Sequence, residues 1–521
     1  MRRKTNYLKQ KRDMKKSFLM LLLLLACTEI IGQRGTYNVM DFGAKGDGKV
    51  LDSPAINAAI EEAVRNGGGQ VLLPAGTYLS GSIRLKSNID LHLAAGAKIL
   101  AVNPRKFKQP KDGPKVVLYD ESESFGGFPE YQDGGHTYFH NSLIWAEGQT
   151  NVSITGHGMI DGEGLTKKDT EKAGQVMGGS IGTGDKAIAL KTCRQVTIRD
   201  ITIYRGGHFG IIMTGCDVST IDNVVIDTNR DGFDIDCCKY MTITNCKINT
   251  PSDDALVLKS SFALKKHVTT EHIAISNCNI TGFKCGTLLD GTYIPEPVGW
   301  VCGRFKLGTE SNGGYRNISL TNCTFMYSSG LAFEEVDQGR MENIVVSNIT
   351  MSHVHHYPIY ITTGCRNRGP KEIEITDENG NRSMIPFTQP STARDIQISN
   401  IIADDCDSLC SIIVTGMPGT PIKNVWLSNI RLYFKGGGTR DLVDKKYREQ
   451  DTNYPEPKFA GWTPAYGLYA RHVEGLHVND VTFRYERPDF RPAVVLDDVK
   501  DVTIEHLDAT TEDGIEQIVR K

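Results

Sequence analysis

The sequence has little excess of charge of either sign. It contains 59 lysine and arginine residues against 62 aspartate and glutamate residues in 521, a formal net charge of −3. A dedicated nucleic-acid-binding protein usually has a strong basic excess, so this balance argues against nucleic acid as a partner. Hydrophobic residues make up 39% and charged residues 23% of the chain. That ordinary composition excludes collagen, disorder and a multi-span membrane protein.

Long hydrophobic runs are absent apart from one near the N-terminus. Lys15 and Lys16 precede a run from Phe18 to Ala26, the pattern of a secretory signal, so residues 1–32 are predicted to be a signal peptide. The run is too short to span a bilayer as a mature anchor. We expect export to the periplasm or the extracellular space without a membrane span. Lipid anchoring through Cys27 stays as an alternative, because Leu-Leu-Ala-Cys is an imperfect lipoprotein box.

Neither a disulfide framework nor a zinc motif is present among the 13 cysteines. There is no CxxC pair with a histidine partner, so zinc has no support. Cys246, Cys278 and Cys323 each follow an asparagine in a similar strand-like context. Stacked, buried small side chains explain this recurrence better than pairing does.

Proline is modest at 20 residues and glycine high at 53, which favours many turns and few long helices. Short phrases that alternate apolar residues with serine or threonine recur at closest spacings of roughly 22 to 29 residues. Such a period is typical of a solenoid. Strands without helices between them predict an all-β, right-handed parallel β-helix. The clearest copies begin at Gln195, Tyr240, His272, Asn317, Asn343, Asp395 and Asn424.

Equivalent residues of successive turns of such a helix stack about 4.8 Å apart. The asparagine that ends each phrase should therefore form a ladder at a bend, where asparagine tolerates a left-handed backbone. These residues are Asn245, Asn277, Asn322, Asn348, Asn400 and Asn429.

One amphipathic helix is predicted near the N-terminus, in the segment from Ser53 to Gly67. Ser53 is suited to the N-cap, Pro54 to the first turn and Gly67 to the stop. The helix would cover the first rung of the solenoid, whose open end otherwise invites edge pairing. We expect a single domain over residues 35–521. Insertions near 107–138 and 366–394 are expected to be surface loops, the second with the hairpin signal Glu378-Asn-Gly-Asn.

The densest acidic cluster is Asn229-Arg-Asp231-Gly-Phe-Asp-Ile-Asp, followed by Asp253 and Asp254. Asp231 and Asp254 are 23 residues apart, about one repeat, so they should share one face on adjacent rungs. Like charges raise each other's pKa, as a general acid working near neutrality requires. A calcium site or a solvated turn is the structural alternative.

These motifs resemble glycoside hydrolase family 28, the polygalacturonase and rhamnogalacturonan hydrolase family, over nearly the whole mature chain. The opening Tyr37-Asn-Val-Met-Asp-Phe-Gly-Ala-Lys-Gly-Asp-Gly is shared among several pectin-active β-helices. Asn229-Arg-Asp231-Gly looks like the family's Asn-Thr-Asp motif, and Asp253-Asp254 looks like its paired aspartates. The segments from Gly308 to Gly314 and from Pro464 to Tyr469 are also similar to family stretches.

The resemblance implies an inverting hydrolase without metal or organic cofactor. Asp253 would be the general acid, while Asp231 and Asp254 would orient and deprotonate the attacking water. Asn229 would hold a substrate hydroxyl or an aspartate. Inversion requires room for the water, usually ~6.5–9.5 Å between acid and base.

The chain also departs from the family pattern. The usual Gly-His-Gly after the paired aspartates is missing, and its place falls near residues 301–303. The family's Arg-x-Lys, which grips a uronate, aligns with residues 332–334, and Glu334 there would repel a uronate. Arg304 and Lys306 either supply positive charge from another rung or are solvated edge residues. Lys259 is the better candidate for lining the cleft.

Several other polar and aromatic residues have two interpretations, one functional and one structural. Glu310, Glu334 and Glu335 extend the acidic face. Either one of them binds hydroxyls of a neutral sugar such as rhamnose, or they are ordinary solvated glutamates. Gly-His157-Gly precedes the acids by three rungs, so His157 is interpreted as a turn residue. A polar loop is favoured over a metal site for the remaining histidine cluster. The histidine cluster consists of His353, His355 and His356. For four aromatic residues, sugar stacking and core packing are equally open interpretations: Trp300, Tyr357, Tyr360 and Trp462.

The sequence thus predicts an exported, monomeric glycoside hydrolase acting on a galacturonic-acid-containing pectic polysaccharide or oligosaccharide, with a mixed or branched backbone. One alternative is a β-helix polysaccharide lyase, although aspartates stand where a lyase needs cations. Another is a non-catalytic carbohydrate-binding β-helix, which the missing histidine and Arg-x-Lys keep open.

Overall fold

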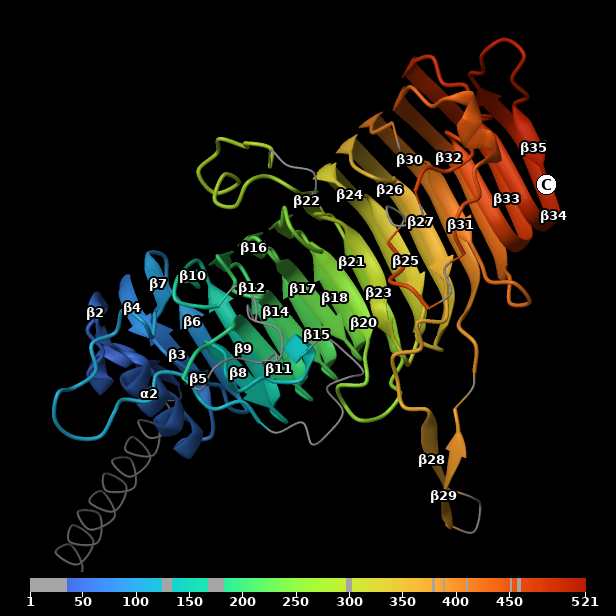
Figure 1. Cartoon of the computed structure of the whole chain (residues 1–521). Helices are drawn as coiled ribbons and strands as arrows, with labels where there is room; N and C mark the ends of the chain where they lie inside the picture. Colours follow the sequence, from blue (N-terminus) through green and yellow to red (C-terminus); the bar gives the residue numbers. More distant parts are fainter. Residues whose placement is uncertain are drawn as a thin grey trace, which may run out of the picture.

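The computed structural model describes residues 35–123, 134–166, 182–296, 302–376, 380–387, 389–408, 411–449, 452–456 and 461–521. The chain winds into a right-handed parallel β-helix, as predicted (Figure 1). Thirty-three of the described strands form one continuous sheet, which is arranged as three stacks around a common core. The proposed signal segment and Cys27 lie outside the described residues.

The first stack is the one that carries the acidic cluster. Its strands are β5 (Ile83–Arg84), β8 (Ile144–Glu147), β11 (Lys186–Lys191), β14 (Phe209–Thr214), β17 (Asp231–Asp236), β20 (Leu256–Ser260), β23 (Phe305–Ser311), β25 (Leu331–Glu335), β27 (Ile359–Thr363), β31 (Ile412–Thr415), parts of β33 (Leu468–Arg487) and β34 (Val494–Ala509), and β35 (Ile518–Arg520).

The second stack runs the length of the solenoid. Its strands are β1 (Thr36–Asn38), β3 (Gly69–Leu73), β6 (Ile89–Leu93), β9 (Thr150–Gly156), β12 (Arg194–Arg199), β15 (Asp217–Asp222), β18 (Lys239–Thr244), β21 (Thr270–Ser276), β24 (Tyr315–Ser328), β26 (Arg340–Val354), β30 (Thr392–Cys406), β32 (Ile422–Gly436) and parts of β33 and β34.

The third stack is separate only in the N-terminal half, because from β24 onward it merges with the second in long bent strands. Its strands are β2 (Asp47–Leu51), β4 (Gly76–Ser80), β7 (Ala97–Ala101), β10 (Met159–Asp161), β13 (Thr202–Tyr204), β16 (Val225–Asp227), β19 (Lys247–Asn249), β22 (Asn279–Thr281) and the end of β24.

Strand alternation separates core from surface in the first stack. Phe233, Leu256 and Phe305 occupy aligned positions on β17, β20 and β23 and are buried in the solenoid interior. Each neighbouring residue points to the outer face, because successive side chains of a strand alternate sides. Asp234 and Lys306 are two of these outward positions.

The predicted asparagine ladder is confirmed. All six asparagines have a left-handed backbone, with φ between 51° and 59°. Asn429 donates to Asn400 at 2.8 Å, Asn400 to Asn348 at 2.9 Å, and Asn348 to Asn322 at 3.1 Å. Side-chain amides therefore satisfy one another along the bend after the second stack, which is the structural role that the repeat predicts.

The cysteine prediction is also confirmed. Cys246, Cys278 and Cys323 are buried free thiols, and the Cys278 N–H donates to the Cys323 sulfur at 3.4 Å. A second run, which the sequence analysis did not identify, joins Cys216 to Cys238 in the same way at 3.3 Å.

The predicted capping helix is present: α2 spans Ser53–Arg65, two residues shorter than the predicted segment, and lies against the first rungs (Figure 1). The predicted N-cap is wrong by one residue: Asp52 occupies that position. The Asp52 carboxylate does not cap the helix but accepts hydrogen bonds from the N–H groups of Lys45 and Gly46. Ser53 instead accepts a hydrogen bond from the Gly81 N–H at 3.3 Å, which ties the helix to the solenoid.

Short 3-10 helices interrupt the loops: η1 (Val39–Phe42), η3 (Gly134–His136) and η4 (Arg440–Asp444).

Two segments cover parts of the outer face of the first stack. Around η3, Phe139 packs on Phe209 and Ile212. Further along, Tyr447 and Ala465 pack with residues of β25, β27 and β31. The rungs of β17, β20 and β23 lie between these two covers, and that is where the acidic cluster is found.

The two predicted loops have different structures. The described part of 107–138 contains η3. The 366–394 insertion carries an antiparallel hairpin, β28 (Glu372–Thr376) and β29 (Arg382–Pro386), that projects away from the solenoid (Figure 1). Its tip, with the predicted turn residues Glu378 and Asn379, lies outside the described residues. Among the described helices, none is both long and apolar enough to cross a membrane.

Candidate active site

Asp231 and Asp254 lie on adjacent rungs of the first stack, as their spacing predicts. The Phe233–Leu256 register of β17 and β20 brings the two rungs together, and the Gly232 N–H donates to the Asp254 carbonyl at 3.0 Å. Asp231 begins β17, and Asp254 lies in the turn just before β20. Both side chains are about 5% exposed.

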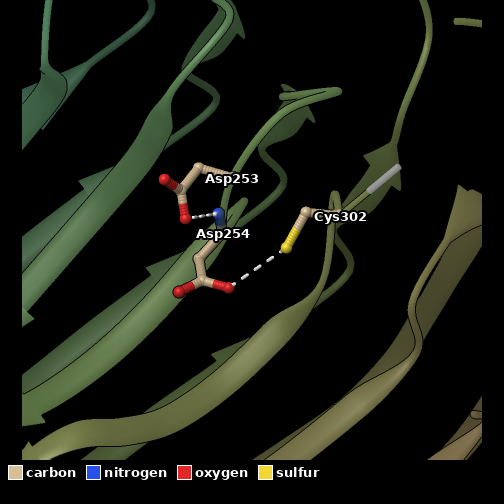
Figure 2. A group of neighbouring side chains, drawn as sticks. All are labelled: Asp253, Asp254 and Cys302. Atoms are coloured by element: carbon tan, nitrogen blue, oxygen red, sulfur yellow. Dashed lines mark hydrogen bonds between the residues drawn. The ribbon is translucent and has the colours of Figure 1, made fainter. Parts of the chain in front are cut away.

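Asp253 is the more accessible acid, with 27% of its side chain exposed. One carboxylate oxygen accepts a hydrogen bond from the Asp254 N–H at 3.1 Å, and the other lies 3.0 Å from the Arg230 guanidinium (Figure 2). The same guanidinium is 3.6 Å from Asp231. Arg230 also lies 3.2 Å from a ring nitrogen of His208. Arg230 therefore links the acids of two rungs.

Asp254 is held by cations. Arg304 donates to it at 2.5 Å, and the Lys306 ammonium lies 3.7 Å from its second oxygen. The Cys302 thiol lies 3.4 Å from the oxygen that Arg304 binds (Figure 2). Asp254 is thus clamped as a carboxylate and is not available to rotate into the cleft.

The three aspartates titrate in opposite directions. Burial, and after it the neighbouring Asp253, raises the pKa of Asp231 well above its ordinary value. Burial and the Asp254 charge also raise the pKa of Asp253, against the opposing effect of Arg230. For Asp254, Arg304 and Lys306 outweigh burial and lower the pKa. Environments that push carboxyl pKa values apart create separate acid and base roles.

Arg304 and Lys306 are buried, so the solvated-edge reading of these two residues is wrong. Besides Asp254, Arg304 binds Glu456 through two nitrogens, at 2.6 and 3.2 Å. Lys306 lies 3.2 Å from Glu334, which is also buried. These cations are already neutralised by protein carboxylates. Their assignment as substrate-binding groups, with that of Glu334, stays a prediction.

Lys259 and Glu310 form an ion pair at 2.9 Å on the outer face of β20 and β23. The pair continues to Asp234, 3.6 Å from Lys259, and to Arg366, 3.4 Å from Glu310. Burial alone would raise the pKa of Glu310, but Lys259 and Arg366 outweigh it and lower that pKa well below its ordinary value. Glu310 is therefore an ionised, buried partner of Lys259, and the solvated reading of Glu310 is wrong. Substrate binding by either residue stays a prediction.

His136 extends this buried chain of charges and was missed by the sequence analysis. Its ring nitrogen lies 2.9 Å from Asp234, and both side chains are fully buried. Burial lowers the pKa of His136, but Asp234 outweighs it and raises that pKa to about 9. Glu456 was also missed. Neither residue belongs to a repeat or motif, so the sequence carries no signal for it.

A metal ion fits this cluster poorly. Asp253, Asp254 and Cys302 each offer one donor atom, and these atoms lie within 4.8 Å of one another. Arg304 and Lys306 already neutralise Asp254, however, and burial raises the pKa of Cys302 well above its ordinary value, so the thiol is not a thiolate. The calcium alternative therefore has no support in the donor chemistry.

The histidine cluster is explained by ion pairing. His353 lies 3.3 Å from Asp405, and His355 lies 2.9 Å from Asp407. Lys435 lies within 3.2 Å of both aspartates. A lysine thus occupies the place that a metal cation would need, which agrees with the polar-loop interpretation.

The remaining candidate residues differ in how buried they are. His157 is exposed in a bend, as predicted. Tyr357 and Tyr360 are buried in the cluster under the second cover, so core packing, not sugar stacking, describes them. Trp462 is half-buried with the Arg491 guanidinium 5.2 Å from its ring. Trp300 lies outside the described residues.

Comparison with known proteins gives this arrangement a context. A family model described as rhamnogalacturonase A/epimerase, pectate lyase-like, matches residues 36–287. A probable polygalacturonase from Vitis vinifera is 23% identical over 411 residues, which cover 76% of this chain and 74% of the relative. A family 28 exopolygalacturonase from Yersinia enterocolitica shares the fold, with a TM-score of 0.62 and 20% identity over 90% of this chain and 78% of that one. The chain is a divergent glycoside hydrolase that is similar to polygalacturonases at low sequence identity.

The three aspartates lie inside the region that the family model matches, whereas Arg304, Lys306 and Glu456 lie beyond it. Mannuronan C5-epimerase AlgE5 from Azotobacter vinelandii is 49% identical over 210 residues, which are 38% of this chain and 20% of that protein. The hydrolase thus shares sequence with enzymes of two reaction types.

Proposed function

We propose that this hydrolase is an exported, inverting enzyme that cleaves galacturonic-acid-containing pectic polysaccharides or oligosaccharides. The observation that carries the proposal is the geometry of the three aspartates on adjacent rungs: Asp253 is 27% exposed and lies 3.0 Å from Arg230, whereas Asp254 is buried and held by Arg304 at 2.5 Å. Two relatives named as polygalacturonases support the pectic substrate.

Asp253 is the general acid of the proposed mechanism. It is the most exposed of the three carboxyls, so it can reach a glycosidic oxygen. Its raised pKa keeps a proton available above the ordinary range of aspartate. Protonation of the leaving oxygen by such a group contributes ~10²–10⁴-fold to rate.

Asp231 is the better base for the attacking water. Asp254 is engaged by Arg304 at 2.5 Å and is not free to accept a proton from water. In this mechanism Asp254 orients Arg304 and the water, while Asp231 and Asp253 share one proton and titrate as a pair.

The sugar beyond the acids, toward β25, is proposed to be neutral. Arg304 and Lys306 are the cations on that side, and both are buried against Glu456, Glu334 and Asp254. A uronate carboxylate bound there would be repelled by these three acids. The two cations that could attract it are already paired with them. A mixed backbone, in which a neutral sugar alternates with galacturonate, avoids that repulsion.

Elimination is the competing chemistry, favoured by a relative named alginate lyase 7, which is 51% identical over 61 residues, or 10% of this chain. The test is incubation with homogalacturonan, rhamnogalacturonan I and rhamnogalacturonan II oligosaccharides, with chromatographic detection of reducing ends and ultraviolet absorbance. We expect saturated products from a rhamnose-containing fraction, initially with inverted anomeric configuration by proton NMR, and their loss in Asp253→Asn. Unsaturated products would establish a lyase instead. No product from any fraction would favour a binding protein.

A further inference from the structure

One arginine faces both carboxyls that exchange protons in the proposed mechanism. Arg230 lies just before β17, and its Nη2 nitrogen is 3.0 Å from an oxygen of Asp253 and 3.6 Å from an oxygen of Asp231. These two carboxyls belong to adjacent rungs, so a single nitrogen bridges the gap between the rungs. Because a guanidinium is always protonated in proteins, its positive charge persists whichever of the two acids is ionised.

His208 holds the same nitrogen from the preceding rung. Phe209 is aligned with Asp231 in the register of β14 and β17, so His208 lies beside Arg230 in the turns that precede these strands. The Arg230 Nη2 donates to the His208 Nε2 at 3.2 Å. An arginine can only donate, so the imidazole presents a lone pair there and is neutral. His208 is 1% exposed and stacks on Phe209, with ring centres 4.2 Å apart, and this packing fixes the acceptor.

The cations on the other side of the acids face a different carboxyl. Arg304 donates to Asp254 at 2.5 Å, and Lys306 lies 3.7 Å from the second oxygen of the same group. They compensate the charge of the carboxylate that takes no proton. Arg230 is placed differently, because it contacts the acid and the base at once.

The proposed reaction moves a negative charge from one of these carboxyls to the other. The water oxygen attacks the anomeric carbon, and the water proton passes to Asp231. The glycosidic bond breaks, and its oxygen takes the proton of Asp253. The pair carries one negative charge before and after, first on Asp231 and then on Asp253. A cation bound to one carboxyl alone would favour one end of the reaction, whereas a cation within 4 Å of both attracts the charge throughout.

We propose that Arg230, held by His208, is a positioning residue of the reaction: it fixes the acid relative to the base and stays beside the negative charge as it passes between them. The inference rests on the proposed function, because it takes Asp253 as the acid and Asp231 as the base.

The pH profile of kcat/KM tests this role on the pectic fraction that the wild type cleaves. Burial raises the pKa of Asp231 and of Asp253, and Arg230 opposes both rises. Arg230→Gln should therefore move both limbs of the profile to higher pH and lower its maximum at least tenfold. Arg230→Lys keeps the charge but not the planar fork, so the maximum should fall while the limbs stay in place. The other charged groups that act on these two acids are unchanged in both variants: Asp254, Lys259, Arg304 and Lys306.

Two further variants separate position from charge. His208→Leu removes the acceptor for Arg230 without removing a charge, so the maximum should fall with the limbs unmoved, and His208→Asn, which restores an acceptor, should recover part of the loss. The matched control is Arg199→Gln, which removes an arginine that is 57% exposed at the end of β12 and should leave the profile as in the wild type. Circular dichroism checks that each variant is folded.

The contact is also tested without turnover, by urea unfolding of Arg230→Gln and Asp253→Asn singly and together. Side chains in contact should change the unfolding constant non-additively, by about threefold or more. Additive effects, or an unshifted profile in Arg230→Gln, would overturn the inference. If Asp253→Asn is inactive while Arg230→Gln keeps the wild-type profile, only the role of Arg230 fails. If Asp253→Asn still cleaves, or no fraction is cleaved by the wild type, the proposed function fails.

Discussion

Two bends of the same solenoid differ in whether the same residue recurs on successive rungs. At the bend after the second stack, the same residue recurs rung after rung, and each asparagine amide binds the next, as between Asn400 and Asn348. At the bend before the first stack, successive rungs carry Asp231, Asp254 and Arg304, which differ in charge. Repetition satisfies polar groups within the stack. The break in repetition leaves carboxyls that can exchange a proton with a substrate.

The costs of the two bends differ accordingly. A left-handed asparagine costs little, because asparagine tolerates that backbone and its amide finds a partner. A buried carboxyl is costly unless it is paired or protonated. Asp254 is paired with Arg304, whereas burial raises the pKa of Asp231 toward the protonated form. The comparison predicts that changes at the acidic bend alter activity and those at the asparagine bend alter only stability.

The largest effect is expected for Asp253→Asn. Loss of the general acid should lower kcat/KM by ~10²–10⁴-fold with little change in the unfolding midpoint. Reducing-end assays on the active pectic fraction measure it. Wild-type activity in this variant would mean that the acid lies elsewhere and that the two bends do not divide function from structure.

Arg304→Met should cost about 3–5 kcal/mol of unfolding free energy, because it leaves Asp254 and Glu456 as buried charges without their partner. Urea denaturation checks it. The control is Arg394→Met, which breaks the more exposed ion pair with Glu342 and should cost less than ~1 kcal/mol. Similar losses in both variants would contradict the clamp.

Asp231→Asn and Asp254→Asn should change the pH dependence of stability in opposite directions. The raised pKa of Asp231 contributes stability below pH 3.8, lost as pH rises through the folded value. Asp231→Asn should therefore gain stability relative to wild type as pH rises. The lowered pKa of Asp254 contributes stability above pH 3.8, lost as pH falls.

Asp254→Asn should accordingly lose most at neutral pH and less in acid. Denaturation at pH 2, 3, 4, 6 and 8 measures both variants, because the Asp254 contribution changes only below pH 3.8 and the Asp231 contribution only above it. Each unit of pKa shift corresponds to about 1.4 kcal/mol. Parallel curves for the two variants would contradict the divergence of the aspartates.

Asn400→Ala should have the smallest effect, about 1–2 kcal/mol of stability with unchanged kcat/KM, because alanine disfavours its φ of 57°. Asn400→Gly tolerates that backbone and should lose less. Thermal unfolding and the reducing-end assay check both. A fall in activity would show that the asparagine bend also serves the chemistry.

The repeating features of the fold follow from the amino-acid sequence alone. The rung period, the asparagine ladder and the alignment of Asp231 with Asp254 follow from strand alternation and stacking, which are local and periodic rules. Helix α2 followed from its amphipathic pattern, and only the cap was misplaced, because Asp52 is used by a turn that local propensity does not reveal.

The surroundings of the acids depend on long-range packing, which the repeat does not encode. Glu456 reaches Arg304 from 152 residues away, and His136 reaches Asp234 from 98 residues away, each on a non-repeating segment that covers the first stack. No periodic signal marks such contacts. Whether a cation is solvated or buried against a carboxylate depends on these covers, and so the burial of Arg304 and the low pKa of Asp254 could not be read from the repeat.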